Sequence, residues 1–402
     1  MYKTPKICRA CGGNDLEEVF NFGKPQPLSN DFTVEGGDRE GFVPLRVMFC
    51  KTCTLAQLGE VVDPAILYRK YLYVTSNSET MLRHFDRLTK DIISENGTGS
   101  LLEVGSNDGK FLNFAASRNF TPVVGVDPAD NLSGGRGLHE NVLQSVGFFG
   151  PEWANITNQK YDIIIARHCF CHQDWQPFMT ACGMLSHENT LIAIEVPYAP
   201  DLLRRAEFDT IYHEHTSYLT IRAVQALLKR HPFHLHGVLK YGIHGGAVLL
   251  MLRHNDSKIQ PHLSADEFLS EESVTKPDWL IFAQKARSKI ESLDSLVRDL
   301  KIRGKIVSMF GASAKGSVLV NACGFTREEI SFCTDNSPLK PGRLIPGTEI
   351  PIIEESEMLS QHPDYAICAA WNFRTEILAK MEKYRQRGGK FIFPTDPGWE
   401  VI

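Results

Sequence analysis

Four adjacent side chains in the stretch FDTIYHEHTSYL could move protons near neutral pH. They are the phenol of Tyr212, the imidazoles of His213 and His215, and the carboxylate of Glu214. Imidazole titrates close to physiological pH, and its pKa responds to a neighbouring carboxylate. A buried phenol can donate to an oxyanion. The alternative interpretation is a polar turn whose histidines bond to backbone groups, so the surrounding sequence must discriminate between the two.

Two matched cysteine pairs near the start of the chain, CRAC and CKTC, predict a structural zinc site. Each CxxC turn can offer two thiolates to one tetrahedral ion, and two such turns leave no coordination position open for chemistry. Disulfides are disfavoured in a reducing cytosol, and redox pairs of the thioredoxin type would need a strand-to-helix context that is missing here. The predicted ligands are Cys8, Cys11, Cys50 and Cys53. The other six cysteines mostly lie in apolar stretches, where we expect them to be core residues.

A strand, a glycine loop and a helix, followed by a second strand that ends in an acid, indicate a nucleoside-cofactor site. SLLEV (100–104) leads into the loop GSNDG (105–109), and PVVGV (122–126) ends at Asp127. This order is that of a Rossmann-type unit. Asp127 lies about 20 residues beyond the loop, where an acid can bond ribose hydroxyls.

The loop favours a methyl donor over a hydride carrier. A dinucleotide fingerprint counted from Gly105 would need glycine where Asn107 and Lys110 stand. The acid-x-Gly-x-Gly-x-Gly pattern of S-adenosylmethionine enzymes departs only at Asn107, and Glu103 would meet the amino-acid end of the donor. The residues that we assign to the cofactor are Glu103, Gly105, Asn107, Asp108, Gly109, Asp127, Pro128 and His168.

Two further strand candidates carry polar residues at their ends. YDIIIA (161–166) precedes His168, and TLIAIEV (190–196) contains Glu195. Ligands in open α/β sheets lie beyond the carboxyl ends of the strands, so both residues are site candidates, although such a residue can also be a cap or a loop anchor. His244 stands beside paired glycines and could approach a ligand, and a simple turn explains it equally well.

A polar stretch from His254 to Pro277 marks the start of another unit. An amphipathic helix is expected over 279–300, and KIVSMF then enters GASAKG, which begins a second strand-glycine-helix unit. Lys315 precedes the second glycine, so the loop is not a P-loop, but backbone amides and a lysine at a helix start suit phosphate. The substrate-binding residues that we expect are His244, Lys315, Lys340 and Arg343.

Between the cysteine pairs and the glycine loop lies an aromatic run, YRKYLYVTSNS, followed by a helical pattern of apolar residues. Most of its tyrosines are expected to pack. Tyr73, followed by Thr75 and Ser76, is the candidate for a segment that folds over the mouth of an active site.

Composition places the chain among globular proteins. It has 402 residues, of which 43% are hydrophobic and 23% charged, enough for two or three domains. It has no apolar run of the roughly 18 residues that a membrane helix needs. Its start, MYKTPKICRA, lacks the apolar core of a signal peptide, so we expect a cytoplasmic protein with no membrane partner. A net charge of −5 without basic runs argues against general nucleic-acid binding.

The order of these motifs resembles the sugar C-methyltransferase family, which methylates C-3 of nucleotide-linked 4-keto-deoxysugars. The resemblance covers nearly the whole chain. Two segments depart from the family pattern: Gly105 stands where a small residue such as alanine is common, and RHCFCHQDW differs from the Asn-rich segment expected there. The matching segments are the two CxxC pairs with QPLSNDF between them, EVGSNDG, IEVPY, FDTIYHEHTSYL, HGGAVLLML, GASAKGSVLVNACG, DNSPLKPGRLIPG and PDYAICAAWNF.

The resemblance implies an α/β fold in three parts: a zinc-binding module (1–75), a class I methyltransferase domain with a doubly wound sheet (76–255) and a smaller Rossmann-like substrate domain (256–402). It also implies S-adenosylmethionine and structural zinc as cofactors. His215 would be the base that removes the C-3 hydrogen, oriented by Glu214, with Tyr212 holding the enolate oxygen and Tyr73 nearby. We expect a monomer whose partner is a nucleotide-linked 4-keto-deoxysugar.

Two other classes of function remain open at this point. A zinc-ribbon nucleic-acid methyltransferase would carry a basic surface lined with aromatic residues, which the acidic net charge disfavours. A non-catalytic scaffold would use the zinc and C-terminal domains to bind partners.

Overall fold

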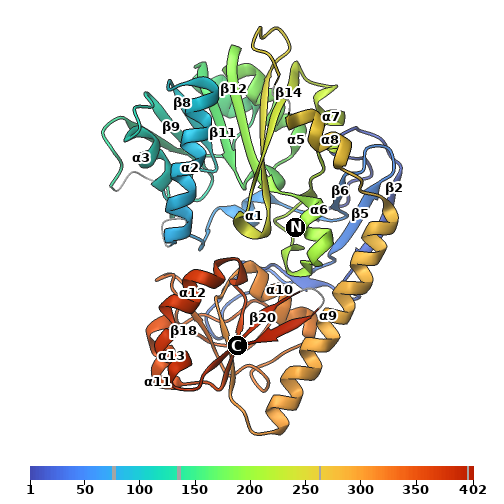
Figure 1. Ribbon diagram of the computed structural model, residues 1–402, viewed down its shortest axis with the longest axis vertical. Helices are drawn as coiled ribbons and strands as arrows, with labels where there is room; N and C mark the ends of the chain where they lie inside the picture. The colour runs from blue at the N-terminus through green and yellow to red at the C-terminus, as the bar shows by residue number, and fades with distance from the viewer. Residues whose placement is uncertain (75–77, 134–136, 262–263, 396–397) are drawn as a thin grey trace.

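The computed structural model describes residues 1–74, 78–133, 137–261, 264–395 and 398–402 (Figure 1). Three main sheets organise these residues: a seven-stranded sheet, a six-stranded sheet and a four-stranded antiparallel sheet. Two further sheets have only two strands each. Across the described ranges, no helix is long and apolar enough to cross a membrane.

The seven-stranded sheet has the strand order β10-β9-β8-β11-β12-β15-β14. Its first five strands run parallel, and β15 runs antiparallel to both of its neighbours. The strands are β8 (Leu101–Val104), β9 (Val123–Asp127), β10 (Val142–Val146), β11 (Tyr161–Arg167), β12 (Ser186–Pro197), β14 (Phe233–Tyr241) and β15 (Ala247–His254).

Both faces of this sheet are covered by helices, which explains why its strands are almost continuously apolar. Alternate residues point to opposite faces: Ile163 and Ile165 pack with Phe85 of α2, whereas Ile164 packs with Trp175 of α5. The helices of this part of the chain are α2 (Glu79–Asn96), α3 (Lys110–Ala116), α4 (Pro151–Thr157), α5 (Trp175–Leu185), α6 (Ala199–Arg205), α7 (Ile221–Leu228) and α8 (Ser264–Glu271).

The six-stranded sheet has the order β18-β17-β16-β19-β20-β21, and only β21 is antiparallel. Its strands are β16 (Val307–Phe310), β17 (Cys333–Asp335), β18 (Ile352–Glu354), β19 (Tyr365–Cys368), β20 (Lys390–Pro394) and β21 (Trp399–Val401). Its helices are α10 (Ala314–Cys323), α11 (Met358–Gln361), α12 (Arg374–Lys380) and α13 (Glu382–Gln386).

The N-terminal module forms an antiparallel sheet of order β13-β6-β5-β2. Its outermost strand, β13, comes from a distant part of the sequence and pairs with β6. This strand lies directly after the His215 segment, so the module and that segment share one sheet. The strands are β2 (Leu16–Asn21), β5 (Arg46–Cys50), β6 (Ala56–Leu58) and β13 (Ser217–Tyr218). The short helix α1 (Pro64–Tyr68) follows the module, and the remaining pairs are β1 (Tyr2–Lys3) with β7 (Val61–Val62) and β3 (Gln26–Pro27) with β4 (Phe42–Val43).

One long helix, α9 (Lys276–Ile302), packs against both the N-terminal module and the six-stranded sheet. Figure 1 shows it running down one side of the molecule, from the blue strands to the red C-terminal elements. A capping box of Thr275 and Asp278 begins it. Its first turns bury Phe282 against Phe20 of β2, and its last turns bury Leu293 in the core of the six-stranded sheet.

The predicted α/β class is confirmed, with a class I methyltransferase sheet, an N-terminal cysteine module and a second Rossmann-like sheet. The strand β10 was not predicted, because its residues VLQSV are mostly half-buried or exposed at the sheet edge. The division into residues 1–75, 76–255 and 256–402 stays a prediction. Its first boundary, like Thr75 and Ser76 of the predicted mouth segment, lies outside the described residues.

Candidate active site and zinc centre

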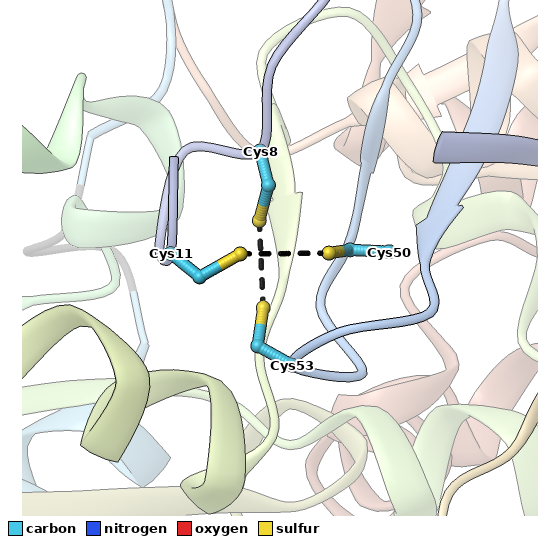
Figure 2. A group of neighbouring side chains, drawn as sticks. All are labelled: Cys8, Cys11, Cys50 and Cys53. Carbon is cyan, nitrogen blue, oxygen red and sulfur yellow. Dashed lines mark hydrogen bonds between the residues drawn. The ribbon is translucent and has the colours of Figure 1, made fainter. Parts of the chain in front are cut away.

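The four N-terminal cysteines converge on one point. Figure 2 shows their sulfurs facing a common centre, two from each CxxC turn. All four sulfurs lie within 4.8 Å of one another, and the Cys8 and Cys53 sulfurs are 3.4 Å apart. Tetrahedral zinc with Zn–S bonds of about 2.3 Å separates its sulfurs by a little under ~4 Å. Four thiolates with no open position fit a structural ion, and these residues would hold it.

Each turn that carries the cysteines closes in the same way. The Gly12 amide bonds to the Cys8 carbonyl, and the Thr54 amide bonds to the Cys50 carbonyl. Gly12 and Thr54 both adopt positive φ, of 76° and 66°. The Thr54 hydroxyl also contacts the Thr220 hydroxyl at the N-terminus of α7, at 3.0 Å, so the second turn is fixed to the methyltransferase part of the chain.

A cavity of about 590 Å³ lies where the three main sheets meet, and residues of all three parts line it. Most of the predicted site residues line it together: Tyr73, Gly105, Asn107, Asp127, Pro128, His168, Tyr212, His215, His244, Lys315 and Lys340. The predicted site residues outside its lining are Glu103, Asp108, Gly109, Glu214 and Arg343.

Tyr212 and His215 form a direct pair inside this cavity. The Tyr212 hydroxyl lies 2.7 Å from Nε2 of His215, and Nδ1 lies 2.8 Å from the Thr210 carbonyl. A carbonyl oxygen only accepts, so Nδ1 carries the hydrogen and Nε2 is the acceptor. Burial lowers the pKa of His215 well below its ordinary value, and the nearby His172 ring adds to this shift. His215 is therefore neutral at physiological pH, with a lone pair on Nε2.

Glu214 does not orient His215, contrary to the expectation. Its carboxylate accepts from the Asn30 side chain at 2.6 Å and from the Tyr71 hydroxyl at 3.1 Å. The Thr210 carbonyl holds the His215 ring instead, because the backbone turns the two neighbouring side chains in different directions. Burial raises the pKa of Glu214 to about 7.

The aromatic run that precedes α2 contributes more than packing. The Tyr71 hydroxyl donates to the carboxylate of Glu214, and the Tyr68 hydroxyl donates to its backbone carbonyl. Tyr73 lines the cavity, and its carbonyl accepts from the Asn107 side chain at 3.0 Å. Tyr68 and Tyr71 do pack, as expected, with ring centroids 6.2 Å apart, and their hydroxyls bond to Glu214 in addition.

The other histidine of the cluster, His213, has a structural environment. It is buried, and its Nε2 lies 3.2 Å from the Val43 carbonyl. Burial lowers its pKa to about 4. Of the two interpretations given for the cluster, the backbone-bonded histidine describes His213, and the chemical role of His215 stays a prediction.

The carboxylate of Asp127 holds the glycine loop through a backbone amide. One carboxylate oxygen accepts from the Asn107 amide and the other from the Ala129 amide, both at 2.8 Å. Carboxylate oxygens have further lone pairs, so this group at the end of β9 can also accept ribose hydroxyls from the cavity. Asn107 adopts φ of 50°, which the loop requires where the motif has glycine.

The two loop glycines are needed by the protein itself. A Cβ on Gly105, at φ of 73°, would lie 2.8 Å from the Cys169 side chain. A Cβ on Gly109 would lie 2.5 Å from Leu138. Cys169 reaches this position because its thiol donates to the Val104 carbonyl at 3.0 Å. Asp108 is partly exposed and accepts from the Lys110 amide.

Glu103 is covered by an arginine that the sequence analysis did not single out. Glu103 is fully buried, and its Oε1 accepts from Nε of Arg167 at 2.8 Å. Arg167 is the last residue of β11 and lines the cavity, whereas Glu103 does not. Burial raises the pKa of Glu103 to about 7, against the opposing effect of Arg167.

His168 and His244 face each other across the cavity wall, with ring centroids 4.5 Å apart. Nε2 of His168 lies 3.6 Å from Oε2 of Glu195, whose other oxygen bonds to His84. Nδ1 of His244 contacts the Asn372 side chain at 3.1 Å, which links it to the C-terminal domain. Burial lowers the pKa of His244 to about 3, so this ring is neutral.

The three predicted basic substrate residues have different surroundings. Nζ of Lys315 lies 4.0 Å from the ring centre of Trp371 and is buried without a hydrogen bond among the described residues. Lys340 donates to the Ala312 carbonyl at 2.7 Å and pairs with Asp335. Arg343 donates to the Phe32 carbonyl at 2.9 Å outside the cavity lining, where it joins the N-terminal module to the C-terminal part.

A second group of metal-type side chains lies in the cavity. Ligand atoms of Cys171, His172 and His215 fall within 4.8 Å of one another. Both nitrogens of His215 already have partners, and burial raises the pKa of the Cys171 thiol to about 12. Because metals bind the thiolate and a free imidazole nitrogen, we do not assign a metal to this group.

Comparison with known proteins identifies the family. A model described as "C-methyltransferase C-terminal domain" matches residues 242–395, a "Putative zinc binding domain" matches 8–68, and a "Methyltransferase domain" matches 75–236. C-methyltransferase NovU of Streptomyces niveus is 32% identical over 403 residues, which is 96% of this chain and 94% of that protein. The chain belongs to the C-methyltransferase family. It is an S-adenosylmethionine-dependent methyltransferase with a structural zinc centre.

Solved structures with related folds are more distant. Magnesium protoporphyrin IX methyltransferase of Synechocystis PCC 6803, solved with bound SAH, has 11% identity and a TM-score of 0.35, over 43% of this chain and 82% of that one. A Geobacter sulfurreducens methyltransferase in complex with S-adenosyl-L-homocysteine has 11% identity and a TM-score of 0.34, over 48% and 99%.

Proposed function

We propose that this C-methyltransferase transfers the methyl group of S-adenosylmethionine to C-3 of a nucleotide-linked 4-keto-deoxysugar. The observation that supports this most directly is the neutral His215, paired through Nε2 with Tyr212 inside the cavity. Methylation at carbon needs a base for a C–H bond and a donor for the resulting oxyanion, and this pair offers both.

The cavity suits a substrate with a charged nucleotide portion. The buried Nζ of Lys315 has no hydrogen-bond partner among the described residues, although it lies over the Trp371 ring and its charge acts on the Glu207 carboxylate. An anionic ligand could supply the missing hydrogen bond to this buried ammonium. Lys315 lies at the start of α10, whose first amides can also face phosphate. Lys340 lines the same cavity, whereas Arg343 lies outside its lining and bonds to backbone carbonyls.

In the proposed reaction His215 acts first. The 4-keto group acidifies the C-3 hydrogen, which moves as a proton to Nε2 of His215 while the C–H electron pair passes into the enolate. The Tyr212 hydroxyl turns from Nε2 to the enolate oxygen and stabilises it. When bound, S-adenosylmethionine would supply an electrophilic methyl group to C-3, and its sulfur would keep the bonding pair. The proton on His215 then leaves to solvent, and the ketone re-forms.

The Thr210 carbonyl supports this cycle. It bonds Nδ1–H of His215, which fixes the tautomer and keeps Nε2 available. Burial alone makes His215 a weak base, but the negative enolate favours the imidazolium that forms beside it. Zinc, enclosed by four thiolates, has no part in the chemistry.

The test uses a panel of nucleoside-diphosphate 4-keto-deoxysugars, with methylated products identified by mass spectrometry and the methylated carbon by NMR. We expect His215→Asn to slow methylation by about 10²- to 10⁴-fold, as for loss of a positioned general base. It should also stop exchange of the C-3 hydrogen with deuterated solvent when S-adenosylhomocysteine fills the donor site. Tyr212→Phe should slow both processes through weaker enolate stabilisation.

His231→Asn is the matched control, because His231 is a partly buried histidine that contacts Gln176 away from the cavity. Exchange at the wild-type rate in His215→Asn would move the base to another residue. If the protein methylates nucleic acid but none of the sugars, the zinc-ribbon nucleic-acid methyltransferase is favoured. If it transfers a methyl group to none of the acceptors, the non-catalytic scaffold is favoured.

A further inference from the structure

Arg167 is the one arginine among the described residues that line the cavity. The two lysines in the lining, Lys315 and Lys340, both come from the C-terminal domain. Among the described residues of the seven-stranded sheet and its helices, Arg167 is thus the single Lys or Arg that lines the cavity. Arg167 is the last residue of β11. The residue before it, Ala166, pairs with Val104, and Val104 leads directly into the glycine loop.

The guanidinium of Arg167 is held rigidly. It lies beside two aromatic rings that contact each other edge to face, with its central carbon 4.5 Å from the ring centre of Phe85 and 4.3 Å from that of Phe111. Nε and Nη2 both donate to the same oxygen of Glu103. Nη1 has no hydrogen bond to any described residue. The ring contacts and the ion pair thus hold the group in place and leave Nη1 without a hydrogen bond to a described residue.

Glu103 cannot meet a ligand directly in this arrangement. Its side chain is fully buried, it is absent from the cavity lining, and its Oε2 has no hydrogen bond among the described residues. Arg167 stands between this carboxylate and the cavity. The arginine, rather than the acid of the glycine-loop motif, is the group that a bound ligand would reach first.

The amino-acid portion of the methyl donor is a zwitterion, because it carries an α-carboxylate and an α-ammonium. A guanidinium is the side chain best matched to a carboxylate, since its N–H groups form a planar fork. We propose that Arg167 binds the α-carboxylate of the methyl donor and that Glu103 is a positioning residue that holds the guanidinium. This inference concerns donor binding only and does not depend on the identity of the sugar.

The test measures binding by calorimetry, without turnover, for three adenosine thioethers. S-Adenosylhomocysteine has the whole amino-acid end, its decarboxylated analogue keeps only the amine, and 5′-methylthioadenosine has neither. Arg167→Leu should weaken the binding of S-adenosylhomocysteine by about 10- to 100-fold, as for loss of a hydrogen-bonded charge pair. The affinities of the other two ligands should stay unchanged, so that selectivity for the carboxylate disappears.

Arg118→Leu is the matched control. Arg118 also stacks on a phenylalanine, Phe114, and pairs with an acid, Asp86, but it lies outside the cavity lining. It should keep the wild-type selectivity. Arg167→Gln provides a second neutral variant that can still donate to Glu103, in case the leucine variant does not fold.

The positioning role of Glu103 is tested by the same selectivity, the affinity for S-adenosylhomocysteine relative to that for its decarboxylated analogue. Glu103→Ala frees the guanidinium and should lower the selectivity for the carboxylate, and Glu103→Gln should restore most of it because the amide oxygen still accepts from Nε. The proposal is overturned if Arg167→Leu or Arg167→Gln keeps the wild-type selectivity. It is also overturned if all three ligands weaken equally in a variant that is folded and retains its zinc.

Discussion

At the scale of single residues, the unusual group is Glu214, a carboxylate next to the proposed base that is buried among neutral partners. Its pKa is raised from 4.5 to about 7, so the native state binds a proton more tightly than the unfolded chain does. Stability that depends on this proton is complete below about pH 4.5 and is lost as the pH rises towards 7. Above that range the protein holds an ionised, desolvated carboxylate.

Glu214→Gln should remove this dependence. We expect the free energy of unfolding of the variant, relative to wild type, to increase between about pH 5.5 and about pH 8, because glutamine does not ionise. Urea unfolding at the two pH values measures the difference. Glu79→Gln, which changes an exposed acid of α2, should show no such trend. An equal effect of Glu214→Gln at both pH values would contradict the raised pKa.

Sequence patterns predicted residue types better than residue partners. Their side chains and spacing singled out Tyr212 and His215, and the structure pairs them in the cavity. The Thr210 carbonyl that orients His215 could not be predicted, because every residue has a carbonyl and only the folded backbone selects one. Arg167 and Glu103 are 64 residues apart, and their pairing depends on the register of β8 and β11. The one available signal was that Arg167, like His168, ends a buried strand.

At the scale of elements, the loop between β8 and α3 depends on the acid at the end of β9. Asp127 fixes the loop through the Asn107 amide and is the predicted ligand of the donor ribose. Asp127→Asn should weaken the binding of S-adenosylhomocysteine by about 10- to 100-fold. The side-chain amide of the variant presents a hydrogen-bond donor where the backbone amide of the loop and a ribose hydroxyl need an acceptor. Calorimetry measures this, with Asp130→Asn, an exposed acid three residues later, as the control.

The strands of both large sheets could be predicted because their apolar runs are buried on two faces and end at glycine loops. The antiparallel N-terminal sheet was expected only as unspecified strands, since its segments are short and mixed in composition. The pairing of β13 with β6 had no local signal, because β13 is two residues long.

Wild-type donor affinity in the Asp127→Asn variant described above would show that the ribose is bound by other groups.

At the scale of the whole molecule, zinc supports a sheet that includes the segment just after His215. Cys50→Ser should therefore reduce zinc from about one ion per chain and lower the melting temperature by at least ~6 °C, as for a loss of ~3 kcal/mol in a domain of 150–250 residues. It should also reduce methylation, although the zinc is remote from the chemistry.

Metal analysis, thermal unfolding and the sugar assay measure these three effects. Cys182→Ala is the control, because Cys182 is a fully buried cysteine of α5 outside the zinc cluster. A Cys50→Ser protein with undiminished zinc and an unchanged melting temperature would contradict the assignment of the centre.

The placement of β13 has a consequence for how the chain is made. β6 has β5 on one side and β13 on the other, and the Leu58 amide bonds to the Thr216 carbonyl. During synthesis β6 leaves the ribosome 159 residues before β13, since β6 ends at Leu58 and β13 begins at Ser217. Until then β6 is an open edge, which invites pairing with other chains. A nascent chain stalled before residue 217 should therefore need chaperone protection, whereas one that extends past residue 218 can close the edge itself.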